Sequence, residues 1–213
     1  MCFGKAKKKD LRVALKKLQK LQGIETSMFF PNLGVEEDWT LVGYGDAGVK
    51  SLPDKLSSCG GQVVMLVNQN MKKACIINWK SKKLVRKVAS SLAAEALALV
   101  AVMGSCVYFK ALLKDIFGQK MAGMPIVLYT DSRNLSRAVH STNQVEDDCL
   151  VVDVAAVKEA LENGTVESVR RVPAKMMMAD SLTKNGASAE TLMRILQTGE
   201  YEMPAGVPDD EDQ

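Results

Sequence analysis

The sequence predicts an α/β fold in which a five-stranded mixed sheet is flanked by helices. Two observations support this. Three strand-like segments follow one another with short polar connections, which is typical of an antiparallel meander. Helical and strand-like segments then alternate along the rest of the chain, as they do where further strands add in parallel. At 213 residues with 47% hydrophobic residues, the chain is long enough for one domain with a sizeable core.

The five predicted strands are short apolar segments bounded by glycine, proline or polar turns. They cover residues 39–45, 60–67, 74–79, 126–129 and 166–172. The first has apolar residues on both faces, as in a central strand. We therefore expect antiparallel pairing among the first three strands and a later strand beside the first.

The longest predicted helix begins at Ser90 or Ser91, either of which is a good N-cap, and ends near Phe117 before Gly118. Its most apolar stretch, 96–109, is too short to span a bilayer, so we expect a buried helix and no membrane partner. Three further helices are predicted at 132–140, 148–162 and 188–198, the last capped by Ser188 and stopped by Gly199.

Three regions are predicted. Residues 1–38 form a basic amphipathic helix over 10–22 and a linker, residues 39–201 form the main domain, and residues 202–213 form a disordered acidic tail. The helix has Leu11, Leu15 and Leu18 at helical spacing, and we expect this face to pack on the domain.

The net charge is only +3, but the basic residues are clustered near the N-terminus and in 80–87, while 209–212 is wholly acidic. Such clusters are compatible with a nucleic-acid partner and equally with a solvated surface. The five cysteines are scattered, odd in number and lack a CxxC pair, which argues against a disulfide scaffold and a zinc site. With no apolar signal segment in the first twenty residues, we expect an intracellular protein, either cytoplasmic or nuclear.

Four acidic residues stand at the ends of different predicted elements: Asp46, Glu95, Asp131 and Asp180. Three of them interrupt hydrophobic stretches, where an unpartnered carboxylate is costly. Oxygen ligands suit a hard cation such as Mg²⁺ or Mn²⁺, and sharing one would offset that cost. Each acid alone has a structural explanation, because helix caps, first helical turns and tight turns also favour acids.

Six short segments resemble, in the same order, motifs of the ribonuclease H domain of copia-type LTR retrotransposon reverse transcriptases. They are residues 41–47 (LVGYGDA), 56–61 (LSSCGG), 77–83 (INWKSKK), 90–95 (SSLAAE), 129–132 (YTDS) and 179–184 (ADSLTK). The likeness runs from about residue 10 to residue 201. It departs from the family at Leu92 and Gly48, and 170–178 lacks the histidine that cellular relatives carry there. The single histidine, His140, is expected to be an ordinary surface residue.

The resemblance implies a ribonuclease H-like fold and metal-dependent cleavage of the RNA strand of RNA–DNA hybrids. The implied catalytic and metal-binding residues are Asp46, Glu95, Asp131 and Asp180, holding two Mg²⁺ ions for which Mn²⁺ can substitute. For binding of such a hybrid we expect phosphate contacts from the basic residues Lys80, Lys82, Lys83, Arg86 and Lys87. The candidates for contacts to the 2′-hydroxyls of the RNA are Ser90, Ser91 and Asn134. A reverse transcriptase polymerase domain is a further implied partner, and we expect this chain to be a detached or domesticated copy.

Two other functions remain open from the sequence. A non-catalytic nucleic-acid-binding or partner-docking domain could keep the same fold, and an integrase-like or transposase-like nuclease on this fold could act on DNA. Metal titration separates the first from an active ribonuclease H, and a comparison of hybrid with duplex DNA separates the second. The oligomeric state is not indicated.

Overall fold

The structure, a computed structural model, describes residues 27–49, 51, 57–88, 90–141 and 148–207, with positions 11, 12, 15, 16, 18 and 19. The strands are β1 (Trp39–Gly48), β2 (Cys59–Asn68), β3 (Lys73–Lys83), β4 (Ile126–Thr130) and β5 (Ser168–Arg171). The helices are α2 (Ser91–Phe117), α3 (Arg133–His140), α4 (Asp148–Glu162), α5 (Asp180–Thr183) and α6 (Glu190–Thr198), with short 3-10 turns at Glu36–Asp38, Gln119–Gly123 and Ala174–Met176.

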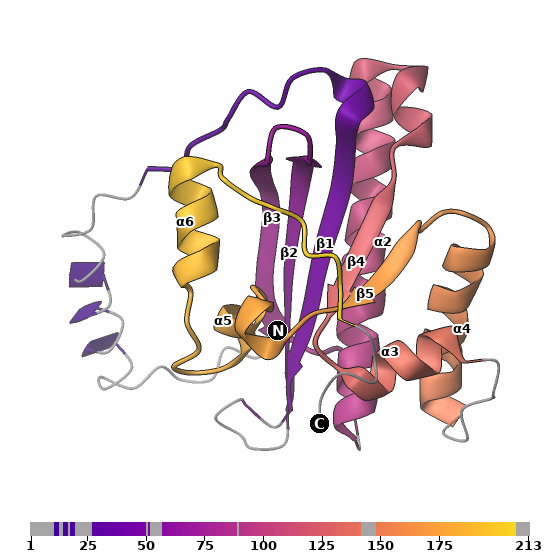
Figure 1. Cartoon of the computed structure of the whole chain (residues 1–213). Helices are drawn as coiled ribbons and strands as arrows, with labels where there is room; N and C mark the ends of the chain where they lie inside the picture. Colours follow the sequence, from indigo (N-terminus) through magenta and orange to yellow (C-terminus); the bar gives the residue numbers. More distant parts are fainter. Residues whose placement is uncertain are drawn as a thin grey trace.

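The five strands form one mixed sheet in the order β3-β2-β1-β4-β5. β1, β2 and β3 pair antiparallel, β4 is parallel to β1, and β5 is parallel to β4 (Figure 1). The predicted fold class is therefore confirmed. The order places the carboxyl ends of β1 and β4 side by side at one edge of the sheet, where α/β folds commonly place their sites.

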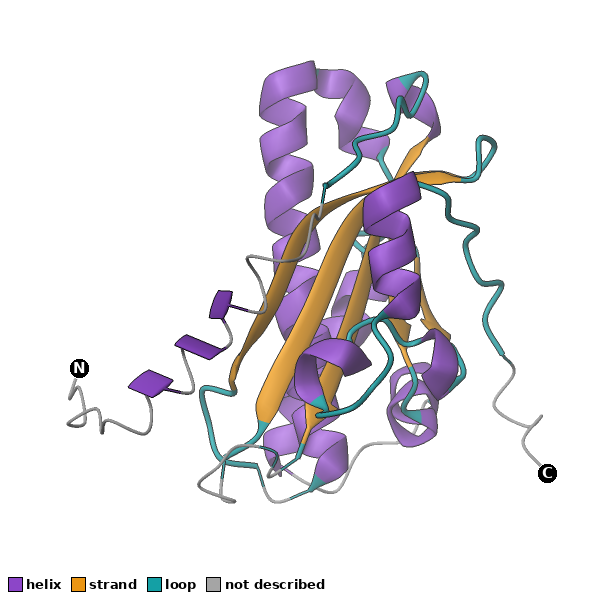
Figure 2. Ribbon diagram, turned by 90° about the vertical axis from the view of Figure 1, so that its left-hand side faces the viewer, coloured by secondary structure: helices purple, strands orange, loops and turns teal. Residues whose placement is uncertain are grey.

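Helices cover both faces of this sheet, and each face has its own apolar core. On one face, α2 and α4 contribute residues such as Leu99 and Val154, which pack with Leu41 of β1. On the other, Ile195 of α6 packs with Val42. Figure 1 shows α6 on the left of the sheet and α2 and α4 on the right, and Figure 2 views the molecule from the α6 side.

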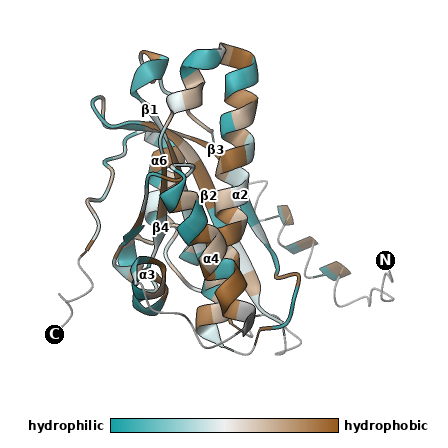
Figure 3. Ribbon diagram, turned by 90° about the vertical axis from the view of Figure 1, so that its right-hand side faces the viewer, coloured by the Kyte–Doolittle hydropathy of each residue, from teal (hydrophilic) through white to brown (hydrophobic). Residues whose placement is uncertain are grey.

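Helix α2 lies unusually close to β1 because β1 carries glycine where the two elements cross. A Cβ at Gly45 would lie 2.9 Å from the carbonyl oxygen of Ala98. By length and composition α2 could cross a membrane, yet here it packs on the sheet through buried residues such as Leu99 and Val102. Figure 3 shows it from the α4 side, with apolar segments along its length. Ser90 is the N-cap, as predicted, but the helix is buried on one face only, since Tyr108 and Ile116 are 64% and 63% exposed.

The element boundaries differ from the predictions in a few places. β3 extends to Lys83 and β5 covers only Ser168–Arg171. The prediction that Ser188 caps the last helix is wrong, because Ala189 occupies the cap position. The Ser188 hydroxyl instead accepts the backbone N–H of Glu190 at 3.2 Å, which closes a local turn.

The six described positions in 11–19 are helical, as predicted, and Leu11, Leu15 and Leu18 are 62%, 49% and 55% exposed. The expected packing of these leucines on the domain is therefore not seen. The rest of the predicted 10–22 helix lies outside the described residues, and the division into three regions stays a prediction.

The segment after α6 lies against the sheet. The Tyr44 ring stacks on Tyr129 with centroids 4.7 Å apart, and its hydroxyl is 2.7 Å from that of Tyr201. Tyr129 donates to the carbonyl of Pro204 at 2.7 Å, and the Val207 N–H donates to Arg171 at 2.8 Å. Residues up to 207, part of the predicted tail, thus cover the edge of β5. Residues 208–213 lie outside the described part.

Candidate metal centre

Asp46 lies near the end of β1, paired with Gly61 of β2, and its side chain is 0% exposed. Both carboxylate oxygens have partners: the Thr183 hydroxyl donates to Oδ2, and the Lys184 ammonium lies 3.4 Å from Oδ1. Burying a carboxylate is costly unless it is paired. Asp46 sits inside a strand and not in a turn, so the turn explanation for this acid does not apply.

Asp131 follows β4 directly and so lies next to the end of β1. Tyr129 pairs with Tyr44, which sets Asp131 level with Asp46. Ser132, not Asp131, caps α3, since its hydroxyl accepts the Leu135 N–H at 3.3 Å. Burial, and then the charge of Asp46, raises the pKa of Asp131 to about 6. Asp131 is thus a carboxylate with no capping role, held close to a second negative charge.

Asp180 begins α5, a single turn that is seated on the sheet beside β1 and β2. A Cβ at Gly61 would lie 2.9 Å from the Ala179 carbonyl oxygen and 2.7 Å from the Thr183 methyl carbon. Because Gly61 has no side chain, α5 approaches the sheet closely enough to bring Asp180 next to Asp46. One oxygen each of Asp46, Asp131 and Asp180 lies within 4.8 Å of the others. The structure therefore brings three of the four predicted acids together.

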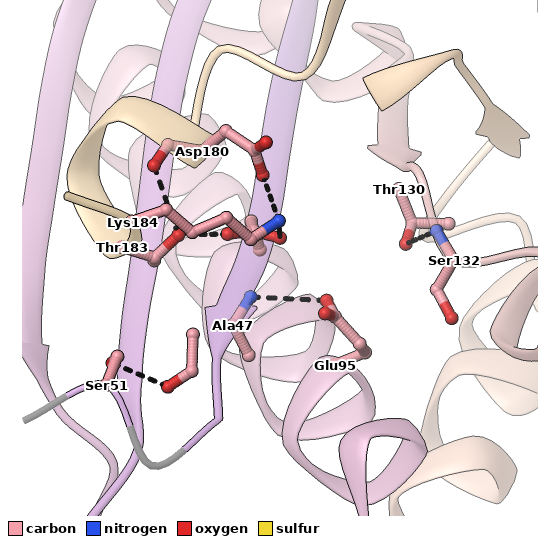
Figure 4. Close-up of polar contacts among 10 residues, drawn as sticks. Ala47, Ser51, Glu95, Thr130, Ser132, Asp180, Thr183 and Lys184 are labelled. Atoms are coloured by element: carbon pink, nitrogen blue, oxygen red, sulfur yellow. Dashed lines mark hydrogen bonds and ion pairs between the residues drawn. The ribbon is translucent and has the colours of Figure 1, made fainter. Parts of the chain in front are cut away.

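Glu95 approaches the same cluster from α2. Its Oε2 accepts the Ala47 N–H at 3.2 Å, as Figure 4 shows. It lies in the second turn of α2, whose first turn holds no acid, so the helix-dipole explanation does not account for it. Burial first, then the charges of Asp46 and Asp131, raises the pKa of Glu95 to about 9. Glu95 is outside the 4.8 Å group but within electrostatic reach of it.

Two residues of the site were missed as functional candidates: Thr183 and Lys184. Lys184 Nζ lies 2.6 Å from Asp180 Oδ1, a contact that Figure 4 shows. Both residues belong to the 179–184 segment, and the i,i+4 spacing of Asp180 and Lys184 was the available signal.

The donor set fits a divalent ion. Three carboxylates converge, and their oxygens are the ligands that Mg²⁺ and Mn²⁺ prefer. Burial also raises the pKa of Asp180, against the effect of Lys184. The pKa values of Glu95 and Asp131 are raised first by burial and then by neighbouring carboxylates, so the charged forms of these acids lack full compensation by the described protein groups. A bound cation would supply that compensation.

Three of the predicted nucleic-acid contacts lie at the end of β3 that is level with Asp46 in the sheet. Lys80, Lys82 and Lys83 are exposed at the end of β3 that pairs with Gly60 and Gly61 of β2. Lys80 and Lys82 line a groove of about 440 Å³ along α2, together with the exposed ring of Tyr108. Lysines beside an exposed aromatic ring are a common setting for nucleic-acid contacts.

The other predicted contacts are placed differently. Arg86 pairs with Asp153 and ties its loop to α4. Ser90 is occupied as the N-cap of α2, accepting the Ala93 N–H at 3.1 Å. Lys87, Ser91 and Asn134 are exposed, and His140 is also exposed, with Nδ1 2.8 Å from the Ser136 carbonyl oxygen. Their roles toward a hybrid stay predictions.

No family model matches this chain, and neither does any curated protein. Solved structures with similar folds include LC11 ribonuclease H1, isolated from compost by a metagenomic approach, at 18% identity and a TM-score of 0.49 over 72% of this chain and 98% of that one. The structure of its complex with an RNA/DNA hybrid has 18% sequence identity and a TM-score of 0.49, and the match covers 72% of this chain and 99% of that one. Ribonuclease H1 from the archaeon Halobacterium salinarum has 19% sequence identity and a TM-score of 0.46, and the match covers 68% of this chain and 94% of that one. At these identities the likeness concerns the fold alone.

Proposed function

We propose that this chain is a metal-dependent endonuclease that hydrolyses the RNA strand of RNA–DNA hybrids, a ribonuclease H. The convergence of Asp46, Asp131 and Asp180 carries the proposal, because three carboxylate oxygens lie within 4.8 Å of one another with Glu95 beside them. Such a cluster is costly to bury and suits divalent cations. The six sequence segments that resemble the retrotransposon ribonuclease H motifs supply the substrate class.

Asp46, Glu95, Asp131 and Asp180 would hold two Mg²⁺ ions, or Mn²⁺ in their place. Divalent ions bound there would lower the pKa of a water nucleophile and stabilise the leaving oxygen. Asp46 is fixed by Thr183 and by the strand that carries it, so its carboxylate is preorganised. Hydrolysis would leave 3′-hydroxyl and 5′-phosphate ends, and no histidine or cysteine nucleophile is needed.

The lysines at the end of β3 would hold the hybrid through its phosphates. Lys80, Lys82 and Lys83 are exposed beside the groove along α2, and Lys87 follows them. Such contacts give affinity that depends on salt and not on base sequence. Ser91 begins the helix that carries Glu95, and Asn134 lies three residues after Asp131 at the start of α3. Both are therefore candidates to contact 2′-hydroxyls of the RNA.

The proposed origin is a copia-type LTR retrotransposon, on the strength of the motif order alone. A polymerase domain of a reverse transcriptase is then a candidate partner, with residues 1–38 as the connecting segment. An intracellular location, nuclear or cytoplasmic, is part of the same proposal.

A substrate panel tests the proposed activity. The wild-type chain and Asp131→Asn would be incubated with Mn²⁺ and with labelled RNA–DNA hybrid, duplex DNA and duplex RNA. We expect cleavage of the RNA strand of the hybrid only, lost in Asp131→Asn. Cleavage of duplex DNA alone would identify a DNA nuclease instead, and binding of the hybrid without cleavage would favour the non-catalytic binding domain.

A further inference from the structure

Lys184 occupies the place at the carboxylate cluster where a cation is needed. Its ammonium lies 2.6 Å from Asp180 Oδ1 and 3.4 Å from Asp46 Oδ1, and so bridges two acids of the proposed metal site. Figure 4 shows the Lys184 side chain extended toward the Asp180 carboxylate. With Thr183 donating to the other oxygen of Asp46, this buried carboxylate is already paired at both oxygens by protein groups.

The position of Lys184 is set by the same short helix that carries Asp180. Its backbone N–H caps α5 by donating to the Asp180 carbonyl at 2.9 Å. α5 in turn rests on Gly48 and Gly61, where any side chain would collide with it. The tight packing of α5 on the sheet therefore fixes the backbone of Lys184 beside the carboxylates, while 43% of the lysine side chain remains exposed. That exposure leaves a path for the ammonium to swing into solvent.

A divalent ion and the ammonium cannot both lie close to the same oxygens without strong repulsion. Asp46 is fully buried and Asp180 is 16% exposed, so these oxygens are poorly screened by water. Whichever cation binds there must displace or push away the other.

We propose that Lys184 is a built-in counter-ion that competes with divalent metal for Asp46 and Asp180, and that metal binding displaces it. The inference rests on the metal site of the proposed function. It gives Lys184 two effects: it stabilises the metal-free protein by pairing the buried acids, and it lowers the affinity of the free protein for metal. Phosphates of a bound substrate would then offer the displaced ammonium a new partner.

The alternative is that Lys184 is a plain ion pair that holds α5 in place. In that case its loss would destabilise the protein and would leave metal affinity unchanged or weaker. The two roles therefore predict opposite changes in metal affinity.

Calorimetric titration of Mn²⁺ into the nucleic-acid-free protein separates them. Lys184→Gln removes the charge and keeps the length, Lys184→Arg keeps the charge, and Lys72→Gln removes an exposed lysine that pairs with Glu202 elsewhere. We expect a roughly tenfold lower dissociation constant for Lys184→Gln, and values within about threefold of wild type for the other two. Thermal unfolding should show Lys184→Gln less stable without metal, with the difference closing at saturating Mn²⁺.

Equal or weaker Mn²⁺ binding by Lys184→Gln would overturn the counter-ion role while leaving the metal site intact. Absence of Mn²⁺ binding that depends on Asp46, checked with Asp46→Asn, would overturn the metal site and the counter-ion together. If Lys184→Gln does not fold, Lys184→Ala provides the same comparison.

Discussion

At the scale of single residues, a structural acid caps a helix or stabilises a turn, and a candidate catalytic acid has no such local role. Ser132 and Ser90 take the caps of α3 and α2, which leaves Asp131 and Glu95 without such a role. Asp46 is buried inside a strand, where no turn needs it. Acids kept at such positions without a structural task are functional candidates on physical grounds.

Thr183 is expected to hold Asp46 in its working orientation. Thr183→Val keeps the shape but removes the donor to Oδ2, so we expect activity to fall about tenfold and stability by about 1 kcal/mol. Thr183→Ser restores a hydroxyl and should recover most of both. Hybrid cleavage rates and denaturant unfolding measure the two effects, and an unchanged rate in Thr183→Val would contradict the positioning role.

The raised pKa of Glu95, about 9, predicts an unusual pH dependence. Because burial and nearby acids raise this pKa in the folded state, the folded protein binds more protons than the unfolded chain between about pH 4.5 and pH 9. Without metal, stability should therefore fall as the pH rises through that window. We expect a loss of roughly 5–10 °C in Tm from pH 6 to pH 8.

Glu95→Gln cannot ionise, so this loss should be smaller in that variant. Added Mg²⁺ should also reduce it at pH 8. A metal-free protein that becomes more stable from pH 6 to pH 8 would show that the acids are compensated in some other way.

At the scale of elements, the site depends on the seating of α5. Gly61→Val would drive a side chain into the Ala179 carbonyl and Thr183, so we expect α5 to shift and activity to fall at least tenfold, with lower stability. Gly104→Ala on α2 is the matched control, because nothing lies within 4 Å of a Cβ there. It should gain about 0.5–1 kcal/mol of stability and keep activity. Equal activity in Gly61→Val would show that α5 is not critical.

The elements themselves could be predicted well from the sequence, but their contacts could not. Periodicity and capping residues located α2 and the strands, and the ends of two parallel strands placed Asp46 beside Asp131. Lys184 was read as part of a motif only, because its pairing with Asp46 spans 138 positions and depends on how closely α5 approaches β2. The wrong cap at Ser188 reflects a local turn that competes with helix initiation.

At the scale of the whole molecule, the exposed lysines at one end of β3 mark the surface on which we expect the hybrid to bind. Lys80→Gln with Lys82→Gln should raise the KM for the hybrid about tenfold with little change in kcat, and should reduce the salt dependence of binding. Lys72→Gln with Lys73→Gln, at the opposite end of β3, is the matched control. If the two double substitutions weakened hybrid binding equally, the effect would come from net charge alone and not from the position of the lysines.

The segment beyond α6 shows why the periphery was harder to predict. The acidic composition of residues 202–213 predicts a disordered tail, yet the Pro204 carbonyl accepts a hydrogen bond from Tyr129 and the Val207 N–H donates to Arg171 of β5. Those contacts depend on a partner far away in sequence, so local composition does not reveal them.

The most direct measurement is cleavage of a labelled RNA–DNA hybrid in Mg²⁺ or Mn²⁺ by the wild-type chain beside Asp46→Asn. We expect cleavage of the RNA strand with either ion, abolished by the substitution in a protein that still folds. No cleavage by a folded wild-type protein that binds the hybrid, or equal cleavage by Asp46→Asn, would contradict it.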